Sequence, residues 1–224
     1  KRFHNGLYLL ASYTFQKALD LGGTDEFSAT SADFKQWDKG HSTFDVPQRL
    51  VFSYLWELPF GKGKALFGNA NGALDKIIGG WQLNGITTFS AGQFKTVGLN
   101  TDWLNLGAFA SSRPNIIGDY TAGRSLPYQY VNSAAFAFPA LHVQGNAGRN
   151  TIEVPGIANW DMSLFKNVLF RERYLTQRRL EAFNIFKHTQ FGVPDLSVGS
   201  PTFGQIGGTL IASRKLQVGL RLQF

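Results

Sequence analysis

The sequence has no cysteine, few charges and no long apolar run. The absence of cysteine from all 224 residues excludes disulfides and thiolate metal sites. No segment approaches the ~18 consecutive apolar residues that a membrane-spanning helix requires. Charged residues make up 17% of the chain, a low fraction for a soluble protein of this size. These absences leave a soluble domain of low charge, or a membrane protein that crosses the bilayer without helices.

Basic residues outnumber acidic ones, giving a net charge of +7. They are scattered, apart from small groups at Lys62 and Lys64 and within residues 171–179. No recognisable nucleic-acid motif surrounds them. We therefore expect no nucleic-acid partner.

Six segments alternate apolar and polar residues with the period of a β-strand. The pattern predicts an all-β chain, an antiparallel meander of about six long strands with long loops. We expect these strands near residues 6–16, 46–59, 79–92, 158–168, 173–187 and 209–224. Most of them offer about the 9–11 residues that a tilted membrane strand needs.

The last segment carries the strongest signal. Even positions from Leu216 to Phe224 are all apolar, and the odd positions between them are Gln217, Gly219, Arg221 and Gln223. A soluble sandwich also alternates, but it rarely ends on a bare apolar strand, because exposed edges invite pairing. A closed barrel in lipid needs an apolar outer face and a partner for its last strand. This comparison favours a membrane barrel.

The alternation assigns residues to two faces. We expect an outward apolar band at Leu50, Phe52, Tyr54, Leu83, Leu164, Leu216, Val218, Leu220 and Leu222. Ser53 belongs to the opposite, concave side, together with the predicted lumen-facing residues Arg49, Glu57, Gln82, Asn84, Asp161, Arg179, Glu181 and Arg221.

The connections orient the predicted sheet. Residues 16–45, 93–159 and 187–207 are long connections, whereas 59–79 is moderate and 168–172 is short. Outer-membrane barrels have long extracellular loops and short periplasmic turns. The sixth strand therefore descends, and Phe224 lies on the periplasmic side. Aromatic girdles are expected near Tyr13, Phe15, Phe89 and Trp160 at the outer boundary, and near Trp56, Phe60, Trp81 and Phe224 at the inner one.

Two resemblances extend this interpretation. The spacing of Gln217, Gly219, Leu222 and Phe224 resembles the C-terminal assembly signal of bacterial outer-membrane barrels. Five further stretches, in their order, resemble the Oar-like TonB-dependent receptors: residues 45–64, 79–86, 159–166, 181–192 and 201–204. The motif Glu181-Ala-Phe-Asn-Ile-Phe-Lys-His-Thr-Gln-Phe-Gly192 is the most distinctive of them. The loop at 96–143 contributes least.

The receptor resemblance implies a barrel of about 22 strands with a plugged lumen, of which residues 1–224 are the C-terminal part. Plug and regulatory-like domains are then expected upstream of Lys1, which is neither a Met nor part of a signal-peptide pattern. The implied location is the bacterial outer membrane. The implied partners are outer-membrane lipid and lipopolysaccharide, the barrel-assembly machinery, the protein's own plug and, through it, the TonB complex. The substrate, bulky in this family, and the direction of transport are not specified.

One segment departs from the family pattern. Residues 174–179 place Thr176 and Arg178 on the face occupied by Leu180 and Ala182, where the family has apolar residues. An arginine facing lipid costs about 2–4 kcal/mol at the midplane and about 0–1 kcal/mol near the interface. Arg178 must therefore snorkel near the interface, or the strand must carry a bulge.

No pattern of catalytic or cofactor-binding residues is present. His4, His41, His142 and His188 lack metal-ligand spacing, and no serine occupies a nucleophile elbow. Residues 61–64 superficially suggest a phosphate loop but lack the rest of that motif. We expect no enzyme activity, no metal and no cofactor. Two alternatives to the receptor stay open, a soluble β-sandwich for binding or adhesion and a plug-less secretion or structural barrel.

Overall fold

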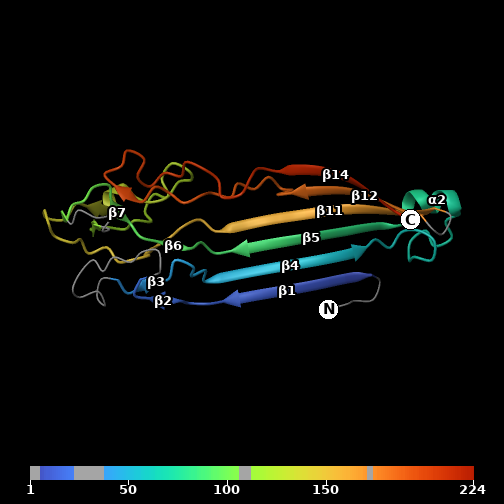
Figure 1. Cartoon of the computed structure of the whole chain (residues 1–224), viewed down its shortest axis with the longest axis horizontal. Coiled ribbons are helices and arrows are strands. Elements are labelled where there is room, and N and C mark those ends of the chain that lie inside the picture. Colours follow the sequence, from blue (N-terminus) through green and yellow to red (C-terminus); the bar gives the residue numbers. More distant parts are fainter. Residues whose placement is uncertain (1–5, 23–37, 106–111, 171–173) are drawn as a thin grey trace.

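The computed structural model describes residues 6–22, 38–105, 112–170 and 174–224. Its main element is a six-stranded antiparallel sheet whose order follows the chain. Figure 1 shows these strands side by side. They are β1 (Leu7–Phe15), β4 (Gln48–Glu57), β5 (Trp81–Ser90), β11 (Ile157–Phe170), β12 (Tyr174–Phe183) and β14 (Lys215–Gln223). The predicted antiparallel meander of six strands is confirmed.

Two predicted boundaries are wrong. The fifth strand ends at Phe183 because Asn184 adopts a left-handed conformation with φ 51°, which ends the extended backbone. The sixth strand begins only at Lys215. The residues before it turn back on the loop after β12, where the Leu210 amide donates to the Gln190 carbonyl over 2.8 Å.

Loops and turns lie at opposite ends of the sheet (Figure 1). The loop end carries residues 16–22, 38–47, 91–105, 112–156 and 184–214. These contain the 3-10 helix η1 (Ser133–Ala135) and the short strands β2 (Leu19–Asp20), β3 (Gly40–His41), β6 (Phe94–Lys95), β7 (Gly98–Leu99), β8 (Asn115–Ile116), β9 (Phe136–Ala137), β10 (Ile152–Glu153) and β13 (Ser197–Val198). The turn end carries residues 58–80, including the helix α2 (Gly72–Ile78). No helix in the described ranges is both long and apolar enough to cross a bilayer.

The ladder register separates an apolar face from a polar face. Residues paired directly across an antiparallel ladder point to the same side of the sheet. One row of such pairs crosses five strands and is entirely apolar: Trp56, Leu83, Leu164, Leu180 and Val218. All nine residues of the predicted apolar band share this apolar face. The predicted face assignment is therefore confirmed, whereas the contact of this face with lipid stays a prediction.

The register around Arg178 is regular. Arg178 pairs with Lys166 on β11 and with Leu220 on β14, and the ladders continue without a bulge from Leu175 to Phe183. The bulge alternative is wrong. Arg178 lies on the apolar face.

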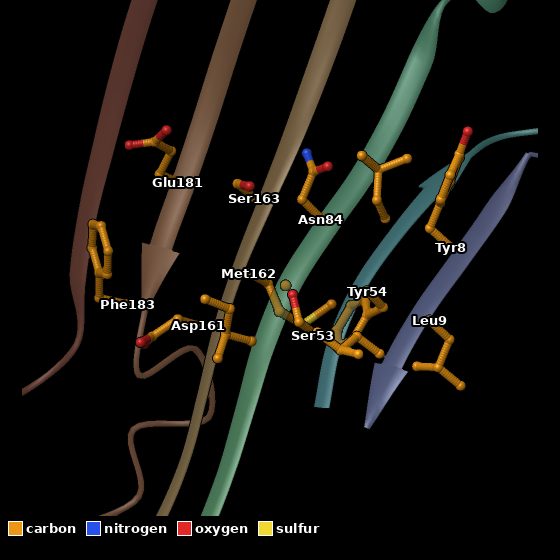
Figure 2. Close-up of a pocket in the computed structure, with 14 residues that line it drawn as sticks. Tyr8, Leu9, Ser53, Tyr54, Asn84, Asp161, Met162, Ser163, Glu181 and Phe183 are labelled. Carbon is orange, nitrogen blue, oxygen red and sulfur yellow. The ribbon is translucent and has the colours of Figure 1, made fainter. Parts of the chain in front are cut away.

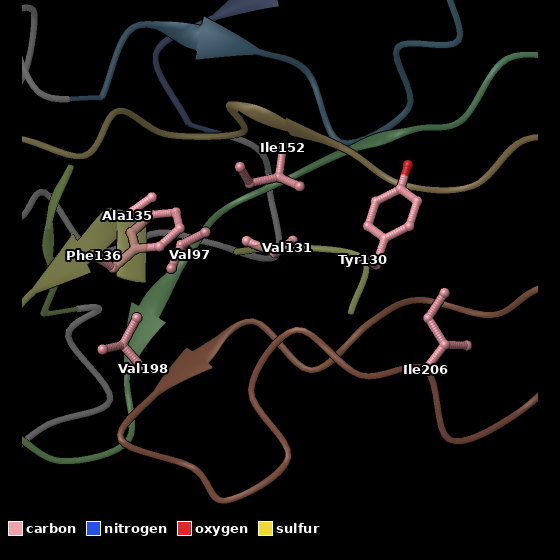
Figure 3. Close-up of a cluster of buried hydrophobic side chains, with 8 residues drawn as sticks. All are labelled: Val97, Tyr130, Val131, Ala135, Phe136, Ile152, Val198 and Ile206. Carbon is pink, nitrogen blue, oxygen red and sulfur yellow. The ribbon is translucent and has the colours of Figure 1, made fainter. Parts of the chain in front are cut away.

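The hydrophobic core lies in the loops and not in the sheet. Side chains on the apolar face are widely exposed, Val218 by 81% of its surface. The buried cluster instead joins the second and third long loops (Figure 3) and consists of Val97, Tyr130, Val131, Ala135, Phe136, Ile152, Val198 and Ile206. We call the packed parts of the three long loops the loop body. Within the described residues no second sheet covers the apolar face, which argues against the sandwich alternative.

Glycines bring the turn end close to the sheet. Gly80 has φ 69°, and a Cβ there would lie 2.3 Å from the Asn167 carbonyl oxygen. The Asn167 amide donates to the Gly80 carbonyl over 2.8 Å. The Gly79-Gly80 pair therefore allows β11 to pass directly against the start of β5.

Candidate functional site: the polar face and the loop body

The polar face contains a hollow of about 580 Å³. Most of its lining side chains come from the polar alternation of β1, β4, β5, β11 and β12. In Figure 2, Asn84, Ser163 and Glu181 lie in one row across β5, β11 and β12, as their pairing requires. The polar face is thus the concave side of the sheet.

All eight residues predicted to face a lumen share the polar face, as their register shows. The Gln82 side-chain amide donates to Asn84 Oδ1 over 2.6 Å, and Arg179 Nε donates to Gln177 Oε1 over 2.6 Å. The buried Asn84 Nδ2 has no hydrogen-bond partner among the described residues. A buried amide without a partner favours binding of a polar group. The contact of the eight predicted residues with a lumen is still a prediction.

The carboxylates of the polar face act locally. Glu57 forms an ion pair with Lys64 in the following turn, at 3.1 Å. Asp161 accepts a hydrogen bond from the Asn184 amide over 2.9 Å. In the described ranges no group of three or more His, Asp or Glu residues is arranged to hold a metal ion. The arrangement suits binding and positioning of polar groups.

The turn at residues 61–64 is built around Asp75. Its carboxylate accepts a hydrogen bond from the Lys62 amide over 2.6 Å, and Gly61 and Gly63 have positive φ angles of 110° and 71°. The segment is therefore a basic turn at the turn end of the sheet.

The segment 181–192, the most distinctive of the receptor-like stretches, builds a clamp at the loop end of β12. Asn184, in its left-handed conformation, accepts a hydrogen bond from the His188 amide and donates one to the His188 carbonyl, both over 2.9 Å. The buried Gln190 side chain accepts from the Ala158 amide over 2.9 Å and donates to the Ala158 carbonyl. Gln190 thus continues the ladder of β11 after β12 has turned away. His188 is a turn residue of this clamp.

Buried arginines join the first long loop to the second. Arg149 pairs with the carboxylate of Asp20 and donates from Nε to the Asp38 carbonyl over 2.7 Å. Arg113 pairs with the Asp38 carboxylate at 2.6 Å, and both of these side chains are almost fully buried. Burial lowers the pKa of Arg149. Sequence reasoning missed these residues, since an isolated arginine in a polar loop carries no periodic signal.

Two histidines of the loop body have structural contacts. His41 lies 2.6 Å from a carboxylate oxygen of Asp45 and stacks on Phe94 with a centroid distance of 3.8 Å. His142 adopts a positive φ of 62°, and its amide donates to the Trp103 carbonyl over 3.3 Å. His4 lies outside the described residues.

The Pro201-Thr-Phe-Gly204 motif forms a turn against the loop core. Gly204 has φ 79°, and a Cβ there would lie 2.3 Å from the Val131 carbonyl oxygen. The Asp195 carboxylate accepts hydrogen bonds from the Ser200 and Thr202 hydroxyls over 2.5 and 2.7 Å. Burial raises the pKa of Asp195, but these hydrogen bonds and that from the Ser197 amide outweigh it, so that the pKa is lowered.

This shift predicts an acid-sensitive turn. Because folding depresses the pKa of Asp195, the stabilisation is present above the unfolded value of about 3.9 and is lost as the pH falls through the folded pKa. The backbone amides of residues 195–205 should therefore exchange their hydrogens faster below about pH 4. Their protection from exchange is measured after correction for the pH dependence of the intrinsic exchange rate. Asp195→Asn should lower protection at neutral pH and flatten its dependence on acid. Asp119→Asn, which alters an exposed turn carboxylate, is the control. Equal effects of both variants on residues 195–205 would contradict the assignment.

The predicted girdle residues lie on the apolar face near both strand ends. At the loop end, Phe89 meets Trp160 edge to face, with centroids 5.2 Å apart. At the turn end, the Trp81 indole donates to the Ile77 carbonyl over 3.1 Å. Tyr13, Phe15 and Trp56 share this face, whereas Phe60 and Phe224 lie outside the strands of the sheet. Their contact with lipid headgroups stays a prediction.

The proposed assembly residues lie on the edge strand β14. Gln217 and Gly219 point to the polar face and Leu222 to the apolar face. Phe224 follows the last ladder pair and is 90% exposed. The structure thus leaves this strand accessible along its length.

Comparison with known proteins agrees with this architecture. Neither the curated proteins nor the solved structures gave a significant match. The model of one family, described as "Outer membrane beta barrel domain", matches residues 1–217. A six-stranded meander with one apolar and one polar face is the wall that such a barrel requires. The chain therefore belongs to the outer membrane beta barrel domain family, which places it in the bacterial outer membrane.

Proposed function

We propose that residues 1–224 form the C-terminal part of the barrel of an Oar-like TonB-dependent receptor. In this proposal a plug domain upstream fills the lumen and the TonB complex energises passage of a bulky substrate, in uptake or export. Barrels of this kind are typically not enzymes, and we expect no catalytic activity from this chain. The receptor-like motifs support the assignment, because the structure gives several of them defined roles in strand contacts, turns and the loop body.

The observation that carries this proposal is the two-faced sheet, which has two unpaired edges among the described residues. The edge strands are β1 and β14. The smallest single-chain bacterial barrels have about 8 strands, more than the six found here. Further strands must complete the wall. The hollowed polar face, with the buried Asn84 amide, then offers hydrogen-bonding groups to whatever fills the lumen. A plug domain is such an occupant.

Single cysteines test the two faces. The chain has no cysteine, so that Ser163→Cys and Leu164→Cys each introduce one thiol into this part of the full-length protein. Ser163→Cys should cross-link to the plug. Leu164→Cys, the neighbouring residue on the other face, should give no plug cross-link and should be quenched by a lipid-attached quencher. Free labelling of Ser163→Cys without any cross-link would support the plug-less barrel and contradict the receptor.

Energy coupling provides a second test. The full-length protein should bind the purified periplasmic domain of TonB, and deletion of the segment upstream of the plug should abolish that binding. Binding that survives this deletion, or no binding by the intact protein, would contradict TonB dependence.

We also propose that Gln217, Gly219, Leu222 and Phe224 are read by the barrel-assembly machinery. Removing Phe224 should cost only about 1.5–3 kcal/mol of burial at most, too little to unfold a large barrel. A severe loss of folded, heat-modifiable protein from the outer membrane would therefore indicate lost recognition. Phe67→Ala, in an exposed turn position, is the control. Normal assembly without Phe224 would refute this role.

A further inference from the structure

Two cations lie next to each other on the apolar face, near the turn end of the sheet. The ladder register aligns Trp81, Lys166, Arg178 and Leu220 in one row across β5, β11, β12 and β14. The next row toward the loop end is wholly apolar, with Leu83, Leu164, Leu180 and Val218. Like charges directly opposite each other destabilise a sheet. The position therefore requires a compensating negative charge.

Lys166 is largely compensated within the protein. It is 7% exposed, its ammonium donates to the Gly79 carbonyl, and it lies 5.3 Å from the centre of the Trp81 ring. The Asp75 carboxylate on α2 attracts it. The Asp75–Lys166 combination therefore leaves little net charge at this point of the row.

Arg178 is the uncompensated member of the row. Its side chain is exposed, and no ion pair or hydrogen bond to it is found among the described residues. Leu180 and Leu220, its apolar neighbours, are 47% and 66% exposed. A guanidinium in such surroundings matches one singly charged oxyanion, to which it donates two parallel hydrogen bonds.

The membrane level of the row identifies that anion. Loops on outer-membrane barrels are long outside and short on the periplasmic side, so that the turn end, with α2, is periplasmic. Trp81 belongs to the predicted inner girdle, the level at which indole rings meet headgroups. We propose that Arg178 binds the phosphate of an anionic phospholipid, such as phosphatidylglycerol, in the periplasmic leaflet, with Trp81 and Leu220 contacting the lipid.

The test compares vesicles that contain only phosphatidylcholine with vesicles that also contain phosphatidylglycerol. Phosphatidylglycerol should raise the thermal stability of the reconstituted full-length protein. Arg178→Gln should lose this gain and bind the lipid about tenfold more weakly, which corresponds to about 1.4 kcal/mol. In phosphatidylcholine alone the variant should be at least as stable as the wild type, because a lipid-facing charge has been removed. Arg178→Lys should retain part of the gain.

The neighbouring Arg179→Gln is the matched control, because Arg179 points to the polar face and should not change the response to phosphatidylglycerol. Equal losses in the two variants, or a full response in Arg178→Gln, would overturn the site. If inorganic phosphate at the same concentration stabilised the protein as much as phosphatidylglycerol does, Arg178 would bind a free ion. That result would also overturn the lipid assignment. These outcomes do not depend on the plug or on TonB.

Discussion

Replacing Leu83 with arginine should reduce the amount of folded protein in the outer membrane. Leu83 lies on the apolar face between Trp56 of β4 and Leu164 of β11, in the apolar row that crosses the sheet. A charge on the lipid face costs about 2–4 kcal/mol at the midplane and about 0–1 kcal/mol near the interface, and the row of Leu83, which contains Trp56 of the predicted inner girdle, lies between these two levels. An arginine at this position lies one row farther from Trp81 than Arg178 does, so that its head reaches the headgroups less easily.

Asn84→Arg is the matched control for Leu83→Arg. Asn84 is the next residue on β5 but points into the hollow of the polar face, where Glu181 also lies (Figure 2). A cation there meets polar groups and a carboxylate in place of lipid. We expect near-normal folding, measured as heat-modifiable protein and as the urea midpoint in vesicles. If both variants assemble equally well, the apolar face does not contact lipid.

The sheet was predictable because its environment imposes a simple rule. Side chains alternate between two faces, so that each strand shows period two in its residue types. Leu216, Val218, Leu220 and Leu222 follow this rule without exception, and the register confirms their common face. Arg178 departs from this pattern, and the sequence alone left the register of its strand undetermined. Its ladder partners show that the exception is a charge on the apolar face and not a shift of the strand.

The loop body was not predictable from local patterns. Its contacts join positions far apart in the sequence, such as Arg149 and Asp20, which are 129 residues apart. Val97, Val131 and Ile152 lie in short segments without a helical or strand period long enough to predict an element. The side chain of Gln190 imitates a strand backbone, and no residue pattern announces that function. The motifs 181–192 and 201–204 pointed to the right segments but not to their contacts.

Truncating Ile152 should loosen the loop body while leaving the sheet intact. Ile152 is fully buried in the core cluster, and Val97 and Val131 are buried with it. Deleting a large part of a buried isoleucine removes its transfer free energy and leaves a cavity, a loss of about 2–5 kcal/mol. That loss is comparable to the whole stability expected of a small packed unit. The loops at 91–156 and 184–214 should therefore separate.

The measurement is protease cleavage of the loops on intact cells, together with heat-modifiability of the barrel. Ile152→Ala should be cleaved in the loops much faster than the wild type, while its barrel remains folded, because the sheet is held by its own ladders. Leu141→Ala, at a 62% exposed position of the same loop, should behave like the wild type. Loss of the barrel in Ile152→Ala would show that the loop body and the sheet fold as one unit, contrary to this account. Unchanged cleavage would mean that the cluster in Figure 3 does not hold the loops together.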